Sequence, residues 1–134
     1  MKNALNTLKV IAEESRLRIF MALRSQELCV CQIVALLGLA ASTTSKHLAL
    51  MYQAGIIDQR KEGRWAHYKA SPNWLRDNAR LADWLLMALS DSDRIMSDKI
   101  RLTEIFAMPP EQLCQPADLC QPDKPAEHRQ RGKK

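Results

Sequence analysis

The chain has 134 residues, of which 46% are hydrophobic, and it carries a formal net charge of +5 at pH 7. This length suits one domain with its own core, and the basic balance favours an anionic partner such as nucleic acid. No apolar run approaches the ~18 residues that span a bilayer, and the N-terminus is unlike a signal peptide. We therefore expect a cytoplasmic protein with no membrane partner, whose cysteines are thiols or ligands rather than structural disulfides.

The first part of the chain predicts two helices. Apolar residues recur at helical spacing from Leu5 to Ile11, which indicates an amphipathic first helix. Ser15 is a candidate N-cap for the second helix, whose apolar face includes Phe20. Three arginines are expected on the solvated side of this second helix: Arg16, Arg18 and Arg24.

A helix-turn-helix is predicted between Val30 and Gly55. Its first helix stops at Gly38, a residue that suits a left-handed C-cap. Its second helix begins near Ser42, after a turn of about four residues, and in this motif the second helix enters the major groove. The residues expected to face inward from the second helix are Leu48, Met51 and Tyr52.

The outward side chains of this second helix are small hydroxyls with one lysine and one histidine. Small polar groups let a helix approach base edges, and a lysine can neutralise a phosphate. The alternative is a polar helix surface without a partner. We predict that the helix reads DNA through Ser42, Thr43, Ser45, Lys46 and His47.

A β-hairpin with a basic tip is predicted directly after this helix. Strand-like segments flank Lys61–Glu62–Gly63–Arg64, and a glycine suits such a turn. The tip would lie beside the DNA-reading helix and act as a wing over the phosphate backbone or minor groove. Trp65 and Tyr68 are expected to pack against the hairpin rather than stack on bases. The basic wing residues are Arg60, Lys61 and Arg64.

The C-terminal part predicts a dimerisation helix, a further helix and a tail. The apolar stripe from Trp74 to Leu89 exceeds what a small winged domain needs, so we expect this helix to pair with a second copy. Five of the six prolines lie beyond Ala107, which indicates a flexible, basic tail. The predicted fold is mainly α with a small β-hairpin (α+β). It comprises a winged helix-turn-helix and dimerisation domain at 1–90, an additional helix at 91–107 and a Pro-rich, Cys-containing tail at 108–134.

Two cysteines, Cys29 and Cys31, stand where the helix-turn-helix begins; we call Cys29–Val30–Cys31 the cysteine box. In an ideal helix, residues two apart point about 200° apart, whereas in an extended chain they share a side. Both thiolates can therefore bind one ion only where the box is extended or unwound, and such a distortion would disfavour the DNA-bound shape. The structural alternative for each cysteine is a small buried hydrophobe.

The chain resembles the ArsR/SmtB family of bacterial metal-sensing transcriptional repressors over roughly residues 5–90. The segments that carry the resemblance are ELCVCQIVALLGL (27–39) and ASTTSKHLALMYQAGIIDQRKEGRWAHYK (41–69). It implies a homodimer that binds operator DNA when metal-free and releases it when metal binds. It also implies that Cys29 and Cys31 are a thiolate box in the third helix, and that the helix and wing residues named above contact DNA.

Three departures from the family patterns bear on the inducer. Where the arsenic-sensing pattern often has a third cysteine, this chain has Val34; the zinc-sensing ligands are missing too, because the histidines lie elsewhere (His47, His67 and His128). Cadmium and lead sensors add N-terminal cysteines, which this N-terminus lacks. Two thiolates make a poor zinc site but can begin a three-sulfur site for As(III) or Sb(III). The candidates for the third sulfur are Cys114 and Cys120, both in the tail.

We therefore expect an As(III)/Sb(III)-responsive repressor that binds double-stranded operator DNA as a homodimer, with no organic cofactor and no enzymatic activity. A cadmium/lead-responsive or thiol-redox-responsive repressor of the same fold stays open at this point. A thiol enzyme or metal-transfer protein is a remote alternative. The sequence contains neither a Cys-x-x-Cys in a βαβ context nor an evident base for a nucleophile.

Overall fold

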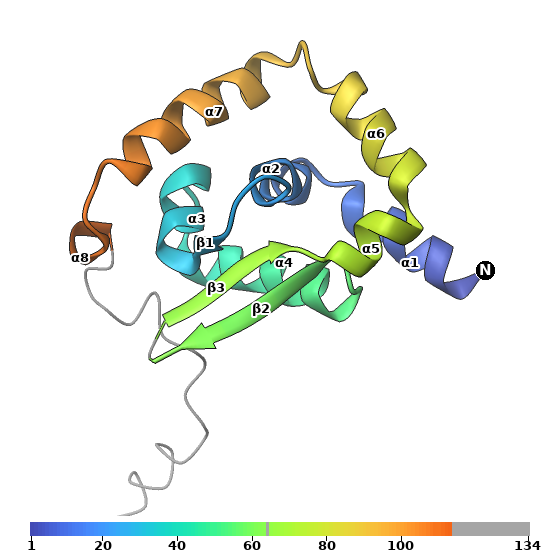
Figure 1. Cartoon of the computed structure of the whole chain (residues 1–134), viewed down its shortest axis with the longest axis horizontal. Coiled ribbons are helices and arrows are strands. Elements are labelled where there is room, and N and C mark those ends of the chain that lie inside the picture. Colours follow the sequence, from blue (N-terminus) through green and yellow to red (C-terminus); the bar gives the residue numbers. More distant parts are fainter. Residues whose placement is uncertain (64, 114–134) are drawn as a thin grey trace, which may run out of the picture.

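The chain is mainly helical with one small sheet, as its computed structural model shows for residues 1–63 and 65–113 (Figure 1). This confirms the predicted winged helix-turn-helix fold. In chain order, the elements of this described part are α1 (Lys2–Ile11), α2 (Glu14–Leu23), β1 (Leu28–Cys29), α3 (Val30–Leu37), α4 (Ala41–Gln53), β2 (Ile57–Glu62), β3 (Trp65–Ala70), α5 (Pro72–Asp77), α6 (Ala79–Ala88), α7 (Asp93–Phe106) and α8 (Pro110–Leu113).

Helix α2 is capped by Glu13, so the prediction that Ser15 caps it was wrong. Glu13 has an extended backbone, and its side chain accepts a hydrogen bond from the backbone N–H of Arg16 at 3.0 Å. A carboxylate at this end satisfies a free N–H and complements the helix dipole. The helix therefore starts one residue before the candidate cap.

The helix-turn-helix consists of α3 and α4. Helix α3 ends at Gly38 in the left-handed conformation (φ 70°), as predicted, and a residue with a side chain would be strained there. On α4, Leu48 and Met51 are buried as predicted, but Tyr52 is 51% exposed. The prediction for Tyr52 was wrong because it lies one residue, about 100° around the helix, beyond the buried stripe.

The sheet is antiparallel with strand order β1-β3-β2. Strands β2 and β3 form the predicted hairpin, and β1 adds a third strand that the sequence did not predict. Cys29 of β1 lies opposite His67 of β3, which in turn lies opposite Arg60 of β2. The cysteine box thus begins within the same sheet as the wing.

The predicted dimerisation helix, with its apolar stripe from Trp74 to Leu89, is two helices, α5 and α6, because the chain leaves helical geometry at Asn78 (φ −123°, ψ 35°). The Asn78 side chain donates to the carbonyl of Trp74 at 3.0 Å and so supports the break. Trp74 is buried and meets Phe20 edge-on with ring centroids 5.4 Å apart. Trp74 is therefore a core residue. The expectation that it belongs to an apolar stripe available to a second copy was wrong.

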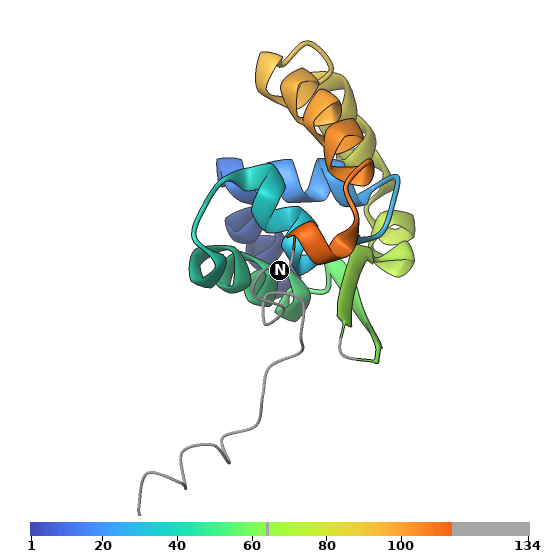
Figure 2. The same ribbon diagram turned by 90° about the vertical axis from the view of Figure 1, so that its left-hand side faces the viewer.

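Helices α6 and α7 form an arch over α2, which Figures 1 and 2 show from two sides. Ser92 caps α7, the predicted additional helix, because its side chain accepts a hydrogen bond from the backbone N–H of Ile95. Helix α7 contacts α2 and α3, and the short helix α8, which the sequence did not predict, contacts α3. The domain limits at 90 and 107 stay a prediction.

In the described part of the chain, no single helix is long and apolar enough to cross a membrane. Helices α3 and α4 reach that length and hydropathy only together, as a pair bent by 114°.

Candidate functional site

The cysteine box lies across the junction between β1 and α3. Cys29 has an extended backbone (φ −85°, ψ 166°) and is the N-cap of α3, while Cys31 lies in the first turn of that helix. Gln32 reaches back to accept a hydrogen bond from the backbone N–H of Cys29 at 2.9 Å. The placement of both cysteines within the third helix, which the resemblance implied, was therefore wrong for Cys29, and the box is half extended before any ligand binds.

Both cysteine side chains are buried, since Cys29 is 5% and Cys31 is 1% exposed. Within residues 1–63 and 65–113, no group of three or more His, Cys, Asp or Glu side chains could hold a metal ion. Cys114 and Cys120 lie outside the described residues. However, Leu113 packs against the core cluster that contains both box cysteines. The chain therefore comes close to α3 one residue before Cys114.

The predicted DNA-reading residues lie on α4 in two environments. Four of them are exposed: Ser42, Thr43, Ser45 and Lys46. His47 is partly buried, and its ring Nδ1 lies 3.3 Å from a guanidinium nitrogen of Arg16, at the start of α2. Sequence reasoning missed this pair because the two residues are 31 positions apart.

The wing contains an ion-pair network centred on Arg60. Its guanidinium donates to both carboxylate oxygens of Glu27, at 3.1 and 2.7 Å, and to Glu62 at 3.0 Å. The hydrogen bond from Arg60 lowers the pKa of Glu27, although desolvation opposes the shift. Lys61 is exposed, and Arg64 lies outside the described residues. The part played by these three basic residues in DNA binding stays a prediction.

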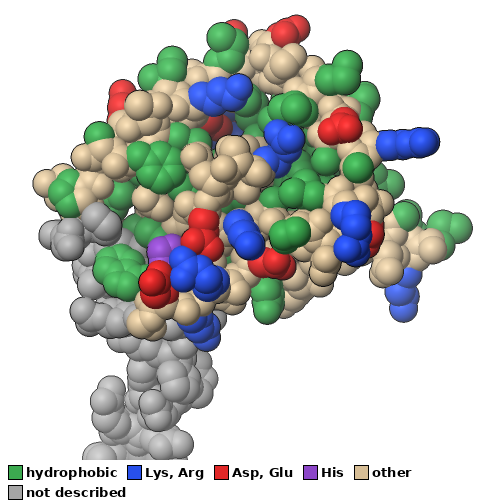
Figure 3. All heavy atoms as spheres, viewed as in Figure 1, with side chains coloured by type: hydrophobic (Ala, Val, Ile, Leu, Met, Phe, Trp, Pro, Cys, Tyr) green, Lys and Arg blue, Asp and Glu red, His purple; other side chains and the backbone are tan. Residues whose placement is uncertain are grey.

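This network connects the wing to the cysteine box. Glu27 stands two residues before Cys29, and Arg60 belongs to β2, on the far side of β3. In the space-filling view, charged side chains of both signs gather over the hairpin (Figure 3). Backbone pairing of β1 with β3 and the Glu27–Arg60 ion pair therefore join the box to the wing by two routes.

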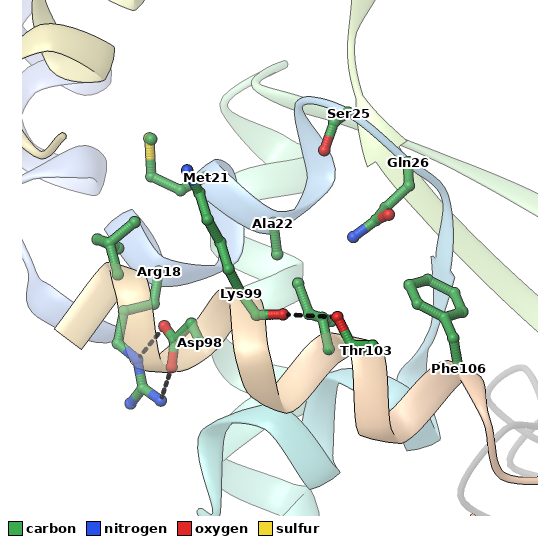
Figure 4. Close-up of a pocket in the computed structure, with 11 residues that line it drawn as sticks. Arg18, Met21, Ala22, Ser25, Gln26, Asp98, Lys99, Thr103 and Phe106 are labelled. Carbon is green, nitrogen blue, oxygen red and sulfur yellow. Dashed lines mark hydrogen bonds and ion pairs between the residues drawn. The ribbon is translucent and has the colours of Figure 1, made fainter. Parts of the chain in front are cut away.

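A pocket of about 280 Å³ opens between α2 and α7 (Figure 4). At one end, Arg18 donates to both oxygens of Asp98, at 2.8 and 2.9 Å, and to the carbonyl of Leu36 at 3.2 Å. Phe106 lies at the other end. Arg18 and Asp98 are both buried, so the expectation that Arg18 is solvated was wrong. No local sequence pattern reveals a pair separated by 80 positions.

Comparison with known proteins places this geometry in a family. Residues 13–59 match the family described as "Bacterial regulatory protein, arsR family". The chain is 32% identical over 94 residues to the "Arsenical resistance operon repressor" of Escherichia coli (strain K12). These aligned residues cover 69% of this chain and 74% of that protein. It is 31% identical over 104 residues to the "Arsenic resistance transcriptional regulator ArsR1" of Pseudomonas putida, over 75% and 78% of the two chains.

A cadmium regulator and two solved structures are also similar. The "Cadmium resistance transcriptional regulatory protein CadC" of Listeria innocua is 38% identical over 61 residues, which are 45% of this chain and 51% of that protein. HlyU from Vibrio cholerae superposes with a TM-score of 0.55 at 32% identity, over 63% of this chain and 91% of that one. A winged helix-turn-helix DNA-binding domain from Mycobacterium bovis superposes with a TM-score of 0.58 at 24% identity, over 67% and 81%. The chain belongs to the arsR family of bacterial regulatory proteins.

Proposed function

We propose that the protein is an As(III)/Sb(III)-responsive repressor that binds double-stranded operator DNA as a homodimer and releases it when thiolates bind the metalloid. The observation that carries this proposal is the position of Cys29 and Cys31, at the junction that leads into the helix-turn-helix. Thiolates are soft ligands and select thiophilic ions. The similarity to regulators named for arsenic resistance supports the same class of inducer.

The burial of the Cys29 and Cys31 side chains couples the binding of a metalloid to the release of DNA. A ligand shifts an equilibrium only by its difference in affinity for the two states. Since both box side chains are buried in the described state, a metalloid must open the β1–α3 junction to reach them. Opening displaces α3, which contacts α4, and weakens the pairing of β1 with β3 of the wing. The ion thereby favours a conformation of the protein in which α4 and the β2–β3 wing are no longer positioned to contact DNA together.

Exposed apolar residues on α1 and α6 support the homodimer. Leu5 and Leu8 are 49% and 53% exposed, and Trp84 and Met87 are 61% and 75% exposed. Large apolar side chains at such exposure on both helices favour a protein interface. The structure from Mycobacterium bovis, of the same fold, is described as homodimeric.

Titration of the DNA complex with different inducers tests the function. Operator binding would be measured with As(III), Sb(III), Cd(II), Pb(II), Zn(II) and peroxide. We expect As(III) and Sb(III) to release the DNA at the lowest concentrations. Release at lower Cd(II) concentrations would favour the cadmium-responsive alternative, which the similarity to CadC supports. Release by peroxide alone would indicate the redox alternative. Release by zinc alone would contradict the arsenic-responsive proposal and both of its alternatives.

A tail cysteine is proposed to complete a three-sulfur site, with Cys114 ahead of Cys120. Helix α8 contacts α3 of the same chain, so we favour ligation within one protomer. The double variant Cys114→Ser/Cys120→Ser is expected to bind As(III) more weakly yet keep part of the response, because two sulfurs still strain the junction. X-ray absorption would count the sulfur ligands. An unchanged three-sulfur shell in the double variant would assign the third donor to an external thiol.

Lys46 is predicted to neutralise one phosphate, since it is exposed on the outer face of α4. Lys46→Ala should weaken operator binding and reduce the slope of log K against log salt by about 0.9, the value for one phosphate contact. Titration at several salt concentrations measures that slope. Lys99→Ala, an equal charge change on α7, is the control. Equal slopes for Lys46→Ala and the wild type would remove Lys46 from the contacts.

A further inference from the structure

We infer that Arg16 positions His47 so that the imidazole presents its Nε2–H to a hydrogen-bond acceptor on DNA. This inference rests on the proposed function, in which α4 reads DNA, and it adds a residue outside the helix-turn-helix to the reading surface. It also determines the kind of group on DNA that His47 can bind, which is a hydrogen-bond acceptor. The acceptor is either N7 of a purine or a phosphate oxygen, and the experiment below separates these two sources.

The Arg16 side chain joins α1 to α4. Its Nε donates a hydrogen bond to the carbonyl of Val10. A second guanidinium nitrogen, NH1, donates to Nδ1 of His47 at 3.3 Å. Val10 lies in the last turn of α1, where carbonyls lack partners within the helix and a cation is favourable. A guanidinium is planar and rigid, so the bond to Val10 fixes the direction of the nitrogen that meets His47.

The contact decides where the imidazole carries its proton. A guanidinium has five N–H donors and no acceptor, so Nδ1 of His47 must accept in this bond. A neutral imidazole that accepts at Nδ1 carries its proton on Nε2. Arg16 is the one hydrogen-bond partner that the described residues give the His47 side chain. The ring therefore keeps Nε2–H as a donor for a group outside the protein.

His47 lies among the residues of the proposed DNA-binding face. His47 lies one turn after exposed Thr43 and next to exposed Lys46 on α4, and it is itself only partly buried. Purine N7 in the major groove and the phosphate oxygens are acceptors. Arg16 also ties this helix to α1, a proposed dimerisation helix, so it links the reading residue to the element that sets the spacing of half-sites.

Nitrogen NMR of the free, full-length protein tests the role of Arg16 without DNA. With ¹⁵N-labelled histidine, wild-type His47 should show an unprotonated Nδ1 and a protonated Nε2. Arg16→Met keeps the apolar stem but removes the donor, so protonation at Nδ1 should become measurable. Arg101→Met is the matched control, because Arg101 lies on α7, away from α4, and should leave the His47 signals unchanged. Identical His47 signals in wild type and Arg16→Met would overturn the inference.

Two substitutions of His47 test which atom faces DNA. His47→Gln places an amide nitrogen near the position of Nε2, whereas His47→Asn reaches only the position of Nδ1. We expect His47→Asn to weaken operator binding about tenfold, the worth of one hydrogen bond of about 1.4 kcal/mol, and His47→Gln to keep most of the affinity. Equal losses in both variants would contradict a donor at Nε2.

Modified operators then identify the acceptor. If His47 reads a base, one 7-deazapurine substitution should cost the wild type about tenfold and cost His47→Asn nothing further. If it contacts the backbone, one methylphosphonate should behave in that way instead. If no 7-deazapurine substitution and no methylphosphonate substitution behaves in this way, the inference is overturned. Failure of the wild type to bind operator DNA would overturn the proposed function, while the NMR result would still test the Arg16–His47 contact.

Discussion

Cys29→Ser and Cys31→Ser are each expected to abolish the release of operator DNA by As(III), while binding to DNA without As(III) stays close to that of the wild type. Serine preserves the size of the side chain but offers a hard hydroxyl in place of a soft thiolate. Each variant leaves one sulfur in the box, and a single sulfur there cannot hold an ion between β1 and α3 in the opened junction. The response should therefore be lost at both positions, in contrast to the partial loss expected for the tail cysteines.

Titration of the preformed operator complex with As(III), followed by fluorescence anisotropy, measures this effect. Because both side chains are buried, a hydroxyl at either position also risks a loss of stability. Cys29→Ala and Cys31→Ala serve as second variants, since alanine adds no polar group, and thermal unfolding identifies any variant that fails to fold. A folded variant that still releases DNA at the wild-type concentration of As(III) would show that its cysteine is not an inducer ligand.

Local signals allowed most of the fold to be predicted. The spacing of apolar residues located α1 to α4, and Gly38 marked the end of α3 because its conformation is left-handed. Ser92 capped α7 through a side chain that competes well for a free N–H. The basic hairpin followed from alternating residues around Gly63. In each case the residues that determine the structure lie within a few positions of one another.

Interactions between distant residues could not be predicted in this way. Strand β1 has two residues, too few for an alternating pattern, and it forms only because β3 is beside it. The contact of Arg16 with His47 and the pairing of Arg18 with Asp98 join residues 31 and 80 positions apart. Cys29 and Cys31 were found from the sequence, but their burial and their position across a strand–helix junction were not.

Breaking the buried pair between Arg18 and Asp98 is expected to cause a large loss of stability. Asp98→Ala would leave the guanidinium buried without its carboxylate, and removal of one partner of a buried pair costs about 3–5 kcal/mol. The hydrogen bonds that Arg18 donates to Asp98 raise the pKa of Arg18, against the opposing effect of desolvation, so the guanidinium stays charged. Urea unfolding measures the free energy, and we expect a lower midpoint with a similar slope.

The double variant Arg18→Met/Asp98→Leu separates the ion pair from the packing of α7. Replacing both partners by apolar groups of similar size is often neutral or stabilising, so the double variant should recover most of the loss seen with Asp98→Ala. Arg101→Met is the matched control, because its pair with Glu104 is exposed, with side chains 43% and 57% accessible, and such pairs are worth about 0.2–1 kcal/mol. If Asp98→Ala costs no more than Arg101→Met, the Arg18–Asp98 pair does not stabilise the packing of α7 against α2.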